Sequence, residues 1–317
     1  MNSQNLTDGG INPKLPRILD GRVLRDQGIT RLKQAIARSK KKPTLAIFQV
    51  GDVDESRAYI EQKRKFAEKI GAGFVHMKFP DDVSETSLIS EIEKLNEDGT
   101  IDGIIVQLPI PVHLNKQKII DTIAVSKDAD GLTSENKKLF EAGLSAATAT
   151  AQAGNTRAIV PATARGVLSL LRFYKIPIAS KKATVIGRSA LVGGPIATLL
   201  RREGALVTVC HSKTPNTVEL SHTADILVVA VGLPRFANKD YVSSTQTVID
   251  VGINSIEGIK LEEEIPKRRL VGDVDFESVK NIVGAISPVP GGVGPMTVLS
   301  LFENLLDMAK IDAKIDK

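Results

Sequence analysis

The segment Ala183-Thr-Val-Ile-Gly-Arg-Ser-Ala-Leu-Val-Gly-Gly-Pro195 decides the fold of the second half of the chain. The apolar run from Ala183 to Ile186 is typical of a buried strand, and a helix is predicted from about Gly194 to Glu203. In a glycine-rich turn between a strand and a helix, backbone amides and the helix N-terminus can meet a phosphate. Gly187 and Gly193 are six residues apart, so the turn is not G-x-G-x-x-G. Alone, such a turn is more often structural than a dinucleotide site.

The end of the next predicted strand, Leu206 to Cys210, bears on the ligand. An acid at this place in a dinucleotide fold selects NAD, but the chain continues Cys210-His-Ser-Lys-Thr214 without one. Hydroxyl groups and a lysine, together with Arg188 in the turn, favour a 2′-phosphate and hence NADP. Considered alone, His211 is interpreted as a hydrogen-bonded loop histidine and Cys210 as a small buried hydrophobe.

The first half of the chain alternates predicted helices and strands. Helices are predicted at 28–39, at 55–70 and from Ser84 to about Gly99, and strands at 45–50, 74–79 and 101–108. Strands separated by helices in this way form parallel sheets. Residues 141–157 are rich in Ala, Thr and Gly and are interpreted as a loop or linker.

The second half continues with predicted helices at 165–174 and 297–309 and strands at 226–231 and 248–251. We therefore expect an α/β protein of two domains with a cleft between them. Residues 1–160 are predicted to form a substrate and catalytic domain, and residues 161–296 a Rossmann-like domain. The C-terminal helix, within 297–317, is expected to pack back on the first domain.

The composition excludes several classes of protein. Of the 317 residues, 42% are hydrophobic and 25% charged, which is typical of a globular protein and excludes a disordered or fibrous one. No apolar run approaches the roughly 18 to 20 residues of a membrane-spanning helix. The single cysteine, Cys210, and a polar start lead us to expect a cytoplasmic protein without a metal site. The net charge of +5 is diffuse and there is no tryptophan, so nucleic acid is not the expected partner.

Four residues of the first half are candidates for chemistry. Tyr59 and Lys63 are four residues apart and share one face of the predicted 55–70 helix, although a lysine on a helix is ordinarily solvated. Gln107 ends a buried strand, where ligands of α/β proteins bind. Asp130 precedes the glycine of Asp128-Ala-Asp-Gly131, which is also an ordinary turn sequence.

Taken together, these stretches resemble the bifunctional methylenetetrahydrofolate dehydrogenase/cyclohydrolase family over nearly the whole chain. The resemblance rests on Ile18-Leu-Asp-Gly21, Ser56-x-x-Tyr59-Ile-x-x-Lys63, Val106-Gln-Leu-Pro-Ile-Pro111, Lys127-Asp-Ala-Asp-Gly131, Gly187-Arg-Ser, Cys210-His-Ser-Lys-Thr214, Val248-Ile-Asp-Val-Gly-Ile-Asn254, Gly272-Asp-Val-Asp-Phe276 and Pro288-Val-Pro-Gly-Gly-Val-Gly-Pro-Met-Thr297.

The resemblance implies a reaction in two steps. 5,10-Methylenetetrahydrofolate passes hydride to NADP, and water then adds to the methenyl product to give 10-formyltetrahydrofolate. It implies that Lys63 is the key cyclohydrolase residue, Gln107 its hydrogen-bond partner, Tyr59 a ring that stacks on the substrate and Asp130 the acid that anchors the pterin.

The resemblance also implies a cofactor site and a dimer. Arg188 and Ser212 match the contacts to the 2′-phosphate. Further cofactor contacts are expected from Gly187, Ser189, Val192, Gly193, His211, Ile253 and Thr297, and substrate contacts from Pro290, Gly291 and Gly292. The family forms homodimers through the second domain, so a homodimer is expected here.

Two alternatives remain at this stage. One is a monofunctional dehydrogenase, although the presence of both Lys63 and Gln107 argues against it. The other is a non-catalytic relative that binds folate or nucleotide, because Pro161-Ala-Thr-Ala164 stands where the family usually has Pro-Cys-Thr-Pro.

Overall fold

The computed structural model describes residues 16–143, 158–256 and 269–313. The chain forms two compact units. One, here called the three-stranded unit, comprises residues 23–166 and 295–317, and the other, the six-stranded unit, comprises residues 1–22 and 167–294. No helix within the described ranges is both long enough and apolar enough to cross a membrane.

The three-stranded unit is built on a parallel sheet in the order β3-β2-β4. Its strands are β2 (Thr44–Val50), β3 (Gly73–Phe79) and β4 (Gly103–Val106). Six of the seven residues of β2 are buried, as expected of a central strand covered on both faces. The parallel sheet predicted for the first half is therefore confirmed.

The helices of this unit are α1 (Gly21–Arg38), α2 (Asp54–Ile70), α3 (Glu85–Glu97), α4 (Lys116–Asp121), α5 (Ser134–Glu141), and the parts of α6 (Ala162–Phe173) and α10 (Val293–Met308) that fall within its bounds, with a 3-10 turn η1 (Val125–Lys127). One core cluster joins Phe48 of β2 to Leu88 of α3 and Ile119 of α4. On α2, the Phe66 ring stacks on Phe302 of α10, with ring centroids 4.9 Å apart.

Local signals set the ends of these helices only in part. The Ser84 hydroxyl caps α3 by accepting a hydrogen bond from the Ser87 N–H at 3.2 Å, and Gly71 ends α2 with a φ of 83°. Helix α1 begins seven residues before its predicted start. Its first two turns were not predicted, because they are mostly polar and exposed and show no apolar face. The short helices α4 and α5 were not predicted. Most of the predicted linker at 141–157 lies outside the described residues.

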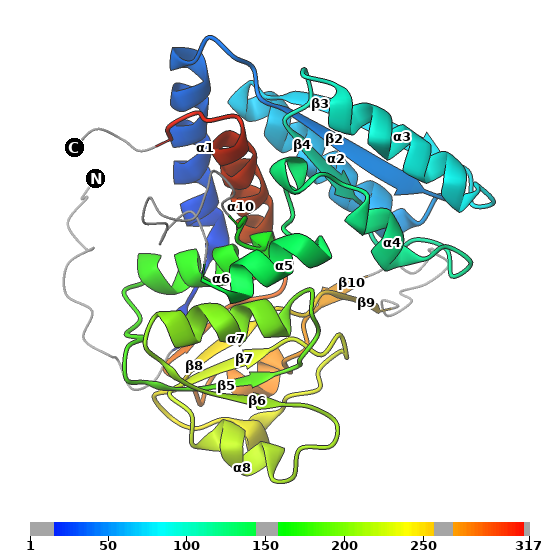
Figure 1. Ribbon diagram of the computed structural model, residues 1–317. Coiled ribbons are helices and arrows are strands. Elements are labelled where there is room, and N and C mark those ends of the chain that lie inside the picture. The colour runs from blue at the N-terminus through cyan, green and yellow to red at the C-terminus, as the bar shows by residue number, and fades with distance from the viewer. Residues whose placement is uncertain (1–15, 144–157, 257–268, 314–317) are drawn as a thin grey trace, which may run out of the picture. The chain divides into compact units, whose positions relative to one another are not determined.

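The six-stranded unit has a parallel sheet in the order β1-β11-β8-β7-β5-β6. Its strands are β1 (Arg17–Ile18), β5 (Lys182–Ile186), β6 (Leu206–Cys210), β7 (Ile226–Val229), β8 (Thr247–Asp250) and β11 (Ala285–Ile286), and β9 (Asn254–Ile256) pairs separately with β10 (Arg269–Val271). Helices α7 (Gly193–Arg202) and α8 (Thr217–His222) lie on opposite faces of the large sheet (Figure 1). A 3-10 turn η2 (Lys239–Tyr241) and a short α9 (Phe276–Val279) complete the unit. This is the Rossmann-like architecture predicted for the second half.

The start of the chain differs from the prediction. Residues 1–160 were expected in the first domain, but Arg17 and Ile18 pair with Ala285 and Ile286 of β11. The Leu19 N–H also donates to the Ile286 carbonyl at 2.8 Å. The large sheet thereby gains an edge strand from the beginning of the chain. The sequence did not predict this strand, because two residues carry no pattern that would reveal their partner.

Candidate functional site

In the three-stranded unit, the structure brings Lys63 and Gln107 into direct contact. The Lys63 ammonium group on α2 donates a hydrogen bond to Gln107 Oε1 at 2.9 Å. Gln107 follows the last residue of β4, and its Nε2 donates to the Leu108 carbonyl at 2.8 Å, which points Oε1 towards the lysine. The predicted pairing of these residues is thus present, although their chemical roles stay predictions.

Lys63 is a buried lysine and not a solvated one. Only 9% of it is exposed. Burial lowers the pKa of its ammonium group, because the charged form loses hydration, and the negative charge of Asp130 partly opposes this shift. Burial raises the pKa of Asp130 in turn, and the charge of Lys63 lowers it. The two groups therefore interact electrostatically.

The face of α2 that carries Lys63 also carries Tyr59 and Ser56, at helical spacings of four and seven residues. Tyr59 is partly exposed, as a ring that stacks on a ligand must be. Ser56 is 3% exposed, and its hydroxyl has no hydrogen-bond partner in the described part of the chain. Ser56 belongs to the Ser56-x-x-Tyr59-Ile-x-x-Lys63 motif, and the sequence predicts no role for it.

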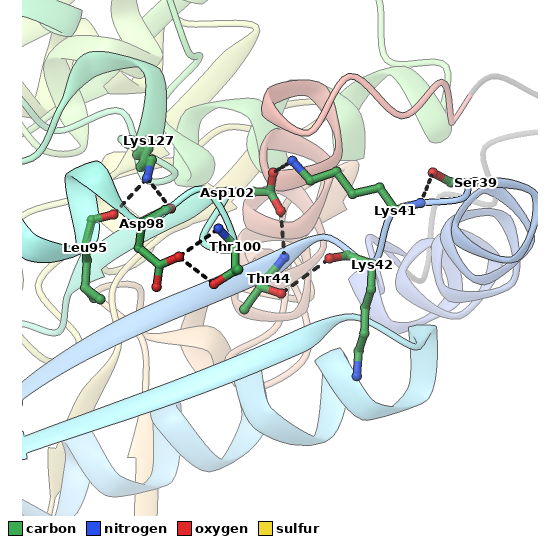
Figure 2. Close-up of polar contacts among 9 residues, drawn as sticks. All are labelled: Ser39, Lys41, Lys42, Thr44, Leu95, Asp98, Thr100, Asp102 and Lys127. Atoms are coloured by element: carbon green, nitrogen blue, oxygen red, sulfur yellow. Dashed lines mark hydrogen bonds and ion pairs between the residues drawn. The ribbon is translucent and has the colours of Figure 1, made fainter.

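Asp130 is held by the other members of its motif. The Lys127 ammonium group caps the end of α3, donating to the carbonyls of Leu95 at 2.8 Å and Asp98 at 2.7 Å (Figure 2). The buried Asp128 carboxylate accepts from the N–H groups of Leu132 at 3.0 Å and Thr133 at 2.7 Å. These contacts fix the backbone on both sides of Asp130.

Gly131 and Asn304 complete this support. Gly131 has a φ of 71°, and a Cβ there would lie 3.1 Å from the Ile159 carbonyl oxygen. From α10, the buried Asn304 Nδ2 donates to the carbonyls of Ala129 and Val160 at 3.0 Å each. Asn304 was not predicted as a site residue, because nothing in a helical pattern shows that a single asparagine faces inward.

In the six-stranded unit, the backbone of the glycine turn after β5 is closely packed. Gly187 has a φ of 116°, and a Cβ on it would lie 2.1 Å from the Ala230 carbonyl oxygen. A Cβ on Gly193 would lie 2.1 Å from the Gly187 carbonyl oxygen. Both positions require glycine. The turn ends at Val192, the N-cap of α7, with the exposed Ser189 inside it.

The predicted 2′-phosphate contacts lie at the same edge of the sheet. Ile186 of β5 pairs with Cys210 of β6, so the exposed Arg188 and the exposed Ser212 and Lys213 follow neighbouring strand ends. His211 Nδ1 accepts a hydrogen bond from the Lys213 N–H at 3.2 Å, as the interpretation of a loop histidine required. Cys210 is fully buried, also as predicted.

The remaining predicted contacts divide between the units. Ile253 follows β8 and is 42% exposed. Pro290, Gly291 and Gly292 follow β11 in the six-stranded unit. Thr297 lies on α10 in the three-stranded unit, where its hydroxyl is 3.5 Å from that of Thr163.

Two family models match the chain. Residues 19–130 match the catalytic domain of tetrahydrofolate dehydrogenase/cyclohydrolase, and residues 161–313 match the NAD(P)-binding domain of the same enzyme. The bifunctional protein FolD of Bacillus cytotoxicus is 41% identical over 296 residues, which are 92% of this chain and 96% of that protein. The chain belongs to the tetrahydrofolate dehydrogenase/cyclohydrolase family.

Further relatives support the assignment to the tetrahydrofolate dehydrogenase/cyclohydrolase family. The FolD structure of Trypanosoma brucei, complexed with NADP cofactor and inhibitor, has a TM-score of 0.84 and 34% identity, covering 93% of this chain and 98% of that one. The mitochondrial C-1-tetrahydrofolate synthase of Schizosaccharomyces pombe is 40% identical over 93% of this chain, which spans only 29% of that protein's length. The expected bifunctional enzyme of one-carbon folate metabolism, with its α/β fold, is confirmed.

Proposed function

We propose that this enzyme oxidises 5,10-methylenetetrahydrofolate with NADP and then hydrates the methenyl product to 10-formyltetrahydrofolate, with Lys63 as the proton-transfer group. The observation that carries the proposal is the hydrogen bond from the buried Lys63 to the partly buried Gln107, together with the charge of Asp130, which acts on the same lysine. Most of the contacts to the folate ring come from the three-stranded unit, through stacking on Tyr59 and hydrogen bonds to Asp130, and most of the contacts to the cofactor come from the six-stranded unit.

The hydration step needs a base and then an acid at one place. Water attacks the methenyl carbon, and its proton passes to the neutral amine of Lys63. The ammonium group then protonates the folate nitrogen as its bond to the carbon breaks. The hydroxyl group on that carbon loses its proton to solvent as the formyl C=O bond forms, so the net reaction releases one proton. A lysine can do this near neutral pH only if its pKa is lowered, and burial lowers it here. Gln107 orients the amine without adding a charge that would raise that pKa.

The dehydrogenase step needs alignment more than acid–base chemistry. NADP supplies the hydride acceptor, and the lone pair of the folate nitrogen stabilises the cation that forms. Reacting atoms must come within roughly 3 to 3.5 Å. The chain contributes the glycine turn after β5, whose backbone lies closer to the neighbouring Ala230 backbone than any side chain at Gly187 would allow. Such a turn exposes backbone amides that can bind a phosphate. We propose that Gly187, Ser189, Val192, Gly193, His211, Ile253 and Thr297 contact the cofactor, and that Pro290, Gly291 and Gly292 contact the substrate.

The preference for NADP is assigned to Arg188, Ser212 and Lys213. All three are exposed at the ends of β5 and β6, where no acid is present to bind a ribose 2′-hydroxyl. Arg188→Ala is expected to raise KM for NADP but not for NAD. Arg201→Ala, an exposed arginine at the other end of α7, is the matched control and should change neither. Equal effects of Arg188→Ala on both cofactors would contradict the assignment.

The departure at Pro161-Ala-Thr-Ala164 does not favour a non-catalytic protein. Helix α6 begins at Ala162, directly after Pro161, and Ala162 and Ala164 are both buried. The altered residues therefore preserve the helix start. Restoring the family pattern with Ala162→Cys and Ala164→Pro should alter catalytic parameters only modestly, and a switch from inactive to active enzyme would contradict this.

The decisive test uses purified protein with 5,10-methylenetetrahydrofolate and either NADP or NAD, following absorbance of reduced nicotinamide and of the methenyl product. A second assay follows decay of added methenyltetrahydrofolate. Methenyl formation with NADP and accelerated decay would support both activities. Formation without accelerated decay would identify a monofunctional dehydrogenase, and neither signal would leave a binding protein.

We also propose a homodimer through the six-stranded unit. Strand β6 pairs only with β5 among the described strands, and Leu206 on it is 63% exposed. An edge strand with an exposed apolar residue is a ready surface for pairing with a second copy. Light scattering after gel filtration tests this, and Leu206→Asp should shift a dimer to monomer. A cytoplasmic location also remains a proposal, supported by the single buried cysteine.

A further inference from the structure

Two buried acids at the carboxyl edge of the six-stranded sheet have no part in the chemistry described above. Asp250 ends β8 and is 2% exposed, and Asp273 follows β10 and is fully buried. We call these two residues the carboxylate pair. The Asp273 N–H donates to Asp250 Oδ1 at 2.9 Å, which places the two acids side by side. Burying two carboxylates is costly, so each must have strong hydrogen-bond partners.

Asp273 holds the loop that follows β7. Its Oδ2 accepts hydrogen bonds from the N–H groups of two successive residues, Val231 at 2.6 Å and Gly232 at 2.8 Å. Hydrogen bonds to a charged carboxylate are shorter and stronger than those between neutral groups. Gly232 has a φ of 69° and is exposed, so the carboxylate fixes a turn that faces solvent and not the core.

The carboxylate pair also holds the loop that follows β8. Asp250 accepts from the N–H groups of Gly252 at 3.1 Å and Val274 at 3.0 Å. Asp273 Oδ1 accepts from Asn254 Nδ2 at 2.9 Å. Ile253, between these two anchored residues, is consequently fixed in an exposed position.

Two glycines make room for the carboxylate pair. A Cβ on Gly252 would lie 2.0 Å from Asp273 Oδ1, and a Cβ on Gly272 would lie 1.7 Å from Asp250 Oδ2. No side chain fits at either position. The glycines and acids of Asp250-Val-Gly252 and Gly272-Asp273 therefore form one interlocking arrangement.

The two anchored loops lie where the second half of a dinucleotide would bind. The chain forms β5 and β6 as neighbours and then crosses to β7 on the other side of β5, so the topological switch point lies between β5 and β7. The proposed 2′-phosphate contacts on Arg188 and Ser212 place the adenosine half over β5 and β6. The nicotinamide half then extends over β7 and β8. Gly187 lies directly against Ala230, so the glycine turn after β5 and the loop after β7 are adjacent.

Each anchored loop presents one exposed apolar side chain. Leu233 is 53% exposed and Ile253 is 42% exposed. Large apolar side chains in solvent-facing loops are suited to contact a flat aromatic ring such as nicotinamide. The positions of these two side chains depend on the backbone of the loops. Among the described residues, the side-chain hydrogen bonds that hold this backbone are those to the carboxylate pair.

We propose that Asp273, supported by Asp250, is a positioning residue for NADP, holding the loops after β7 and β8 so that Leu233 and Ile253 contact the nicotinamide half. This role rests on the proposed cofactor site. The shape of that site is set by two acids, Asp250 and Asp273, that do not touch the cofactor. Asp273→Leu, which removes every acceptor, is expected to weaken NADP binding at least 10-fold. Asp273→Asn keeps one acceptor oxygen for the Val231 and Gly232 amides, and the Asn254 amide can turn to match it, so binding should stay within about 3-fold of wild type.

The experiment measures NADP and NADPH binding by calorimetry on the full-length protein, together with cyclohydrolase activity on methenyltetrahydrofolate without cofactor and the melting temperature. Gln246→Leu is the matched control. Gln246 is buried at the opposite edge of the same sheet, where its Nε2 donates to the carbonyls of Ser221 and Ala224 at 2.7 Å each. This control should lower the melting temperature without weakening NADP binding, and cyclohydrolase activity should be unchanged in all variants.

Several results would overturn the proposal. One is that Asp273→Leu binds NADP as tightly as the wild type. Another is that Gln246→Leu loses as much NADP affinity as Asp273→Leu. A third is that Asp273→Asn and Asp273→Leu lose NADP affinity equally. If Asp273→Leu does not fold, Asp273→Ser replaces it with the same expected loss, and wild-type binding there would equally refute the role. If the wild-type protein binds NADP but turns over no folate, only the proposed reaction fails. If it binds no NADP, both the cofactor assignment and this inference fail.

Discussion

Replacing Asp250 with asparagine should change how the stability of the protein depends on pH. Burial, together with the nearby charge of Asp273, raises the pKa of Asp250 from 3.8 to about 7, against the opposing effect of hydrogen bonds from Val274, Asp273 and Gly252. Between those two values the folded protein holds a proton that the unfolded chain has released. The free energy of unfolding contributed by this group therefore falls as pH rises from about 4 to about 7.

The size of the effect follows from that shift in pKa. A shift of about 3 units at roughly 1.4 kcal/mol each makes Asp250 destabilising by about 2 kcal/mol at pH 5 and about 4 kcal/mol at pH 8. Asparagine cannot ionise, so Asp250→Asn removes this dependence. It also replaces an acceptor oxygen by an amide donor, which costs roughly 1 to 3 kcal/mol at every pH. The difference in free energy of unfolding between the variant and the wild type should therefore shift in favour of the variant by roughly 2 to 3 kcal/mol when the pH is raised from 5 to 8.

Urea unfolding followed by far-ultraviolet circular dichroism at pH 5 and pH 8 measures this difference, because the chain has no tryptophan. The relevant transition is the one that NADP shifts to higher urea, since a ligand stabilises the unit that binds it. Gln246→Leu changes no ionisable group, so its free energy of unfolding should fall below that of the wild type by the same amount at both pH values. A difference between Asp250→Asn and wild type that is constant to within about 1 kcal/mol would refute the reasoning.

Three further predictions concern the catalytic unit. Lys63→Met should slow hydration by about 100- to 10,000-fold while sparing some hydride transfer, measured by the two absorbance assays, and equal loss of both would mean that the lysine is structural or serves substrate binding. Gln107→Glu should raise the pKa of Lys63, since a negative charge replaces the neutral amide that it contacts, and so move the pH profile of the cyclohydrolase to higher pH; an unmoved profile would exclude Lys63 as the titrating group. Phe302→Ala, which removes a fully buried ring stacked on Phe66, should cost about 3 to 5 kcal/mol in unfolding experiments, whereas Val112→Ala at a fully exposed position should cost under about 0.5 kcal/mol.

The sequence predicted the regular parts of the fold because their signals are local. Buried strands such as β2 and β5 read as short apolar runs, and Ser84 caps α3 through its own hydroxyl. The first turns of α1 and the short helices α4 and α5 escaped prediction. Their stability comes from packing and caps, such as Thr133 accepting from the Asn136 N–H at 3.1 Å, more than from an apolar stripe.

The candidate site was predictable only as residue types at strand ends and on one helix face. Lys63 and Gln107 could be chosen from spacing and the family resemblance, but a lysine on a helix is solvated unless the fold buries it. Burial and the 2.9 Å contact to Gln107 exist only in the folded chain. Burial lowers the pKa of the lysine in the direction that hydration chemistry requires.

By itself, the sequence determined the α/β class, the glycine turn at Gly187 and the residues available for chemistry, because strand periodicity and glycine requirements act over a few neighbouring residues. Only the tertiary structure decided that Arg17 and Ile18 join the six-stranded sheet, that Asn304 supports Asp130, and that Asp250 and Asp273 lie side by side. Each of these contacts joins segments distant in sequence. Their partners are chosen by which backbone groups are left to be satisfied once the sheets have formed, and no local pattern records that choice.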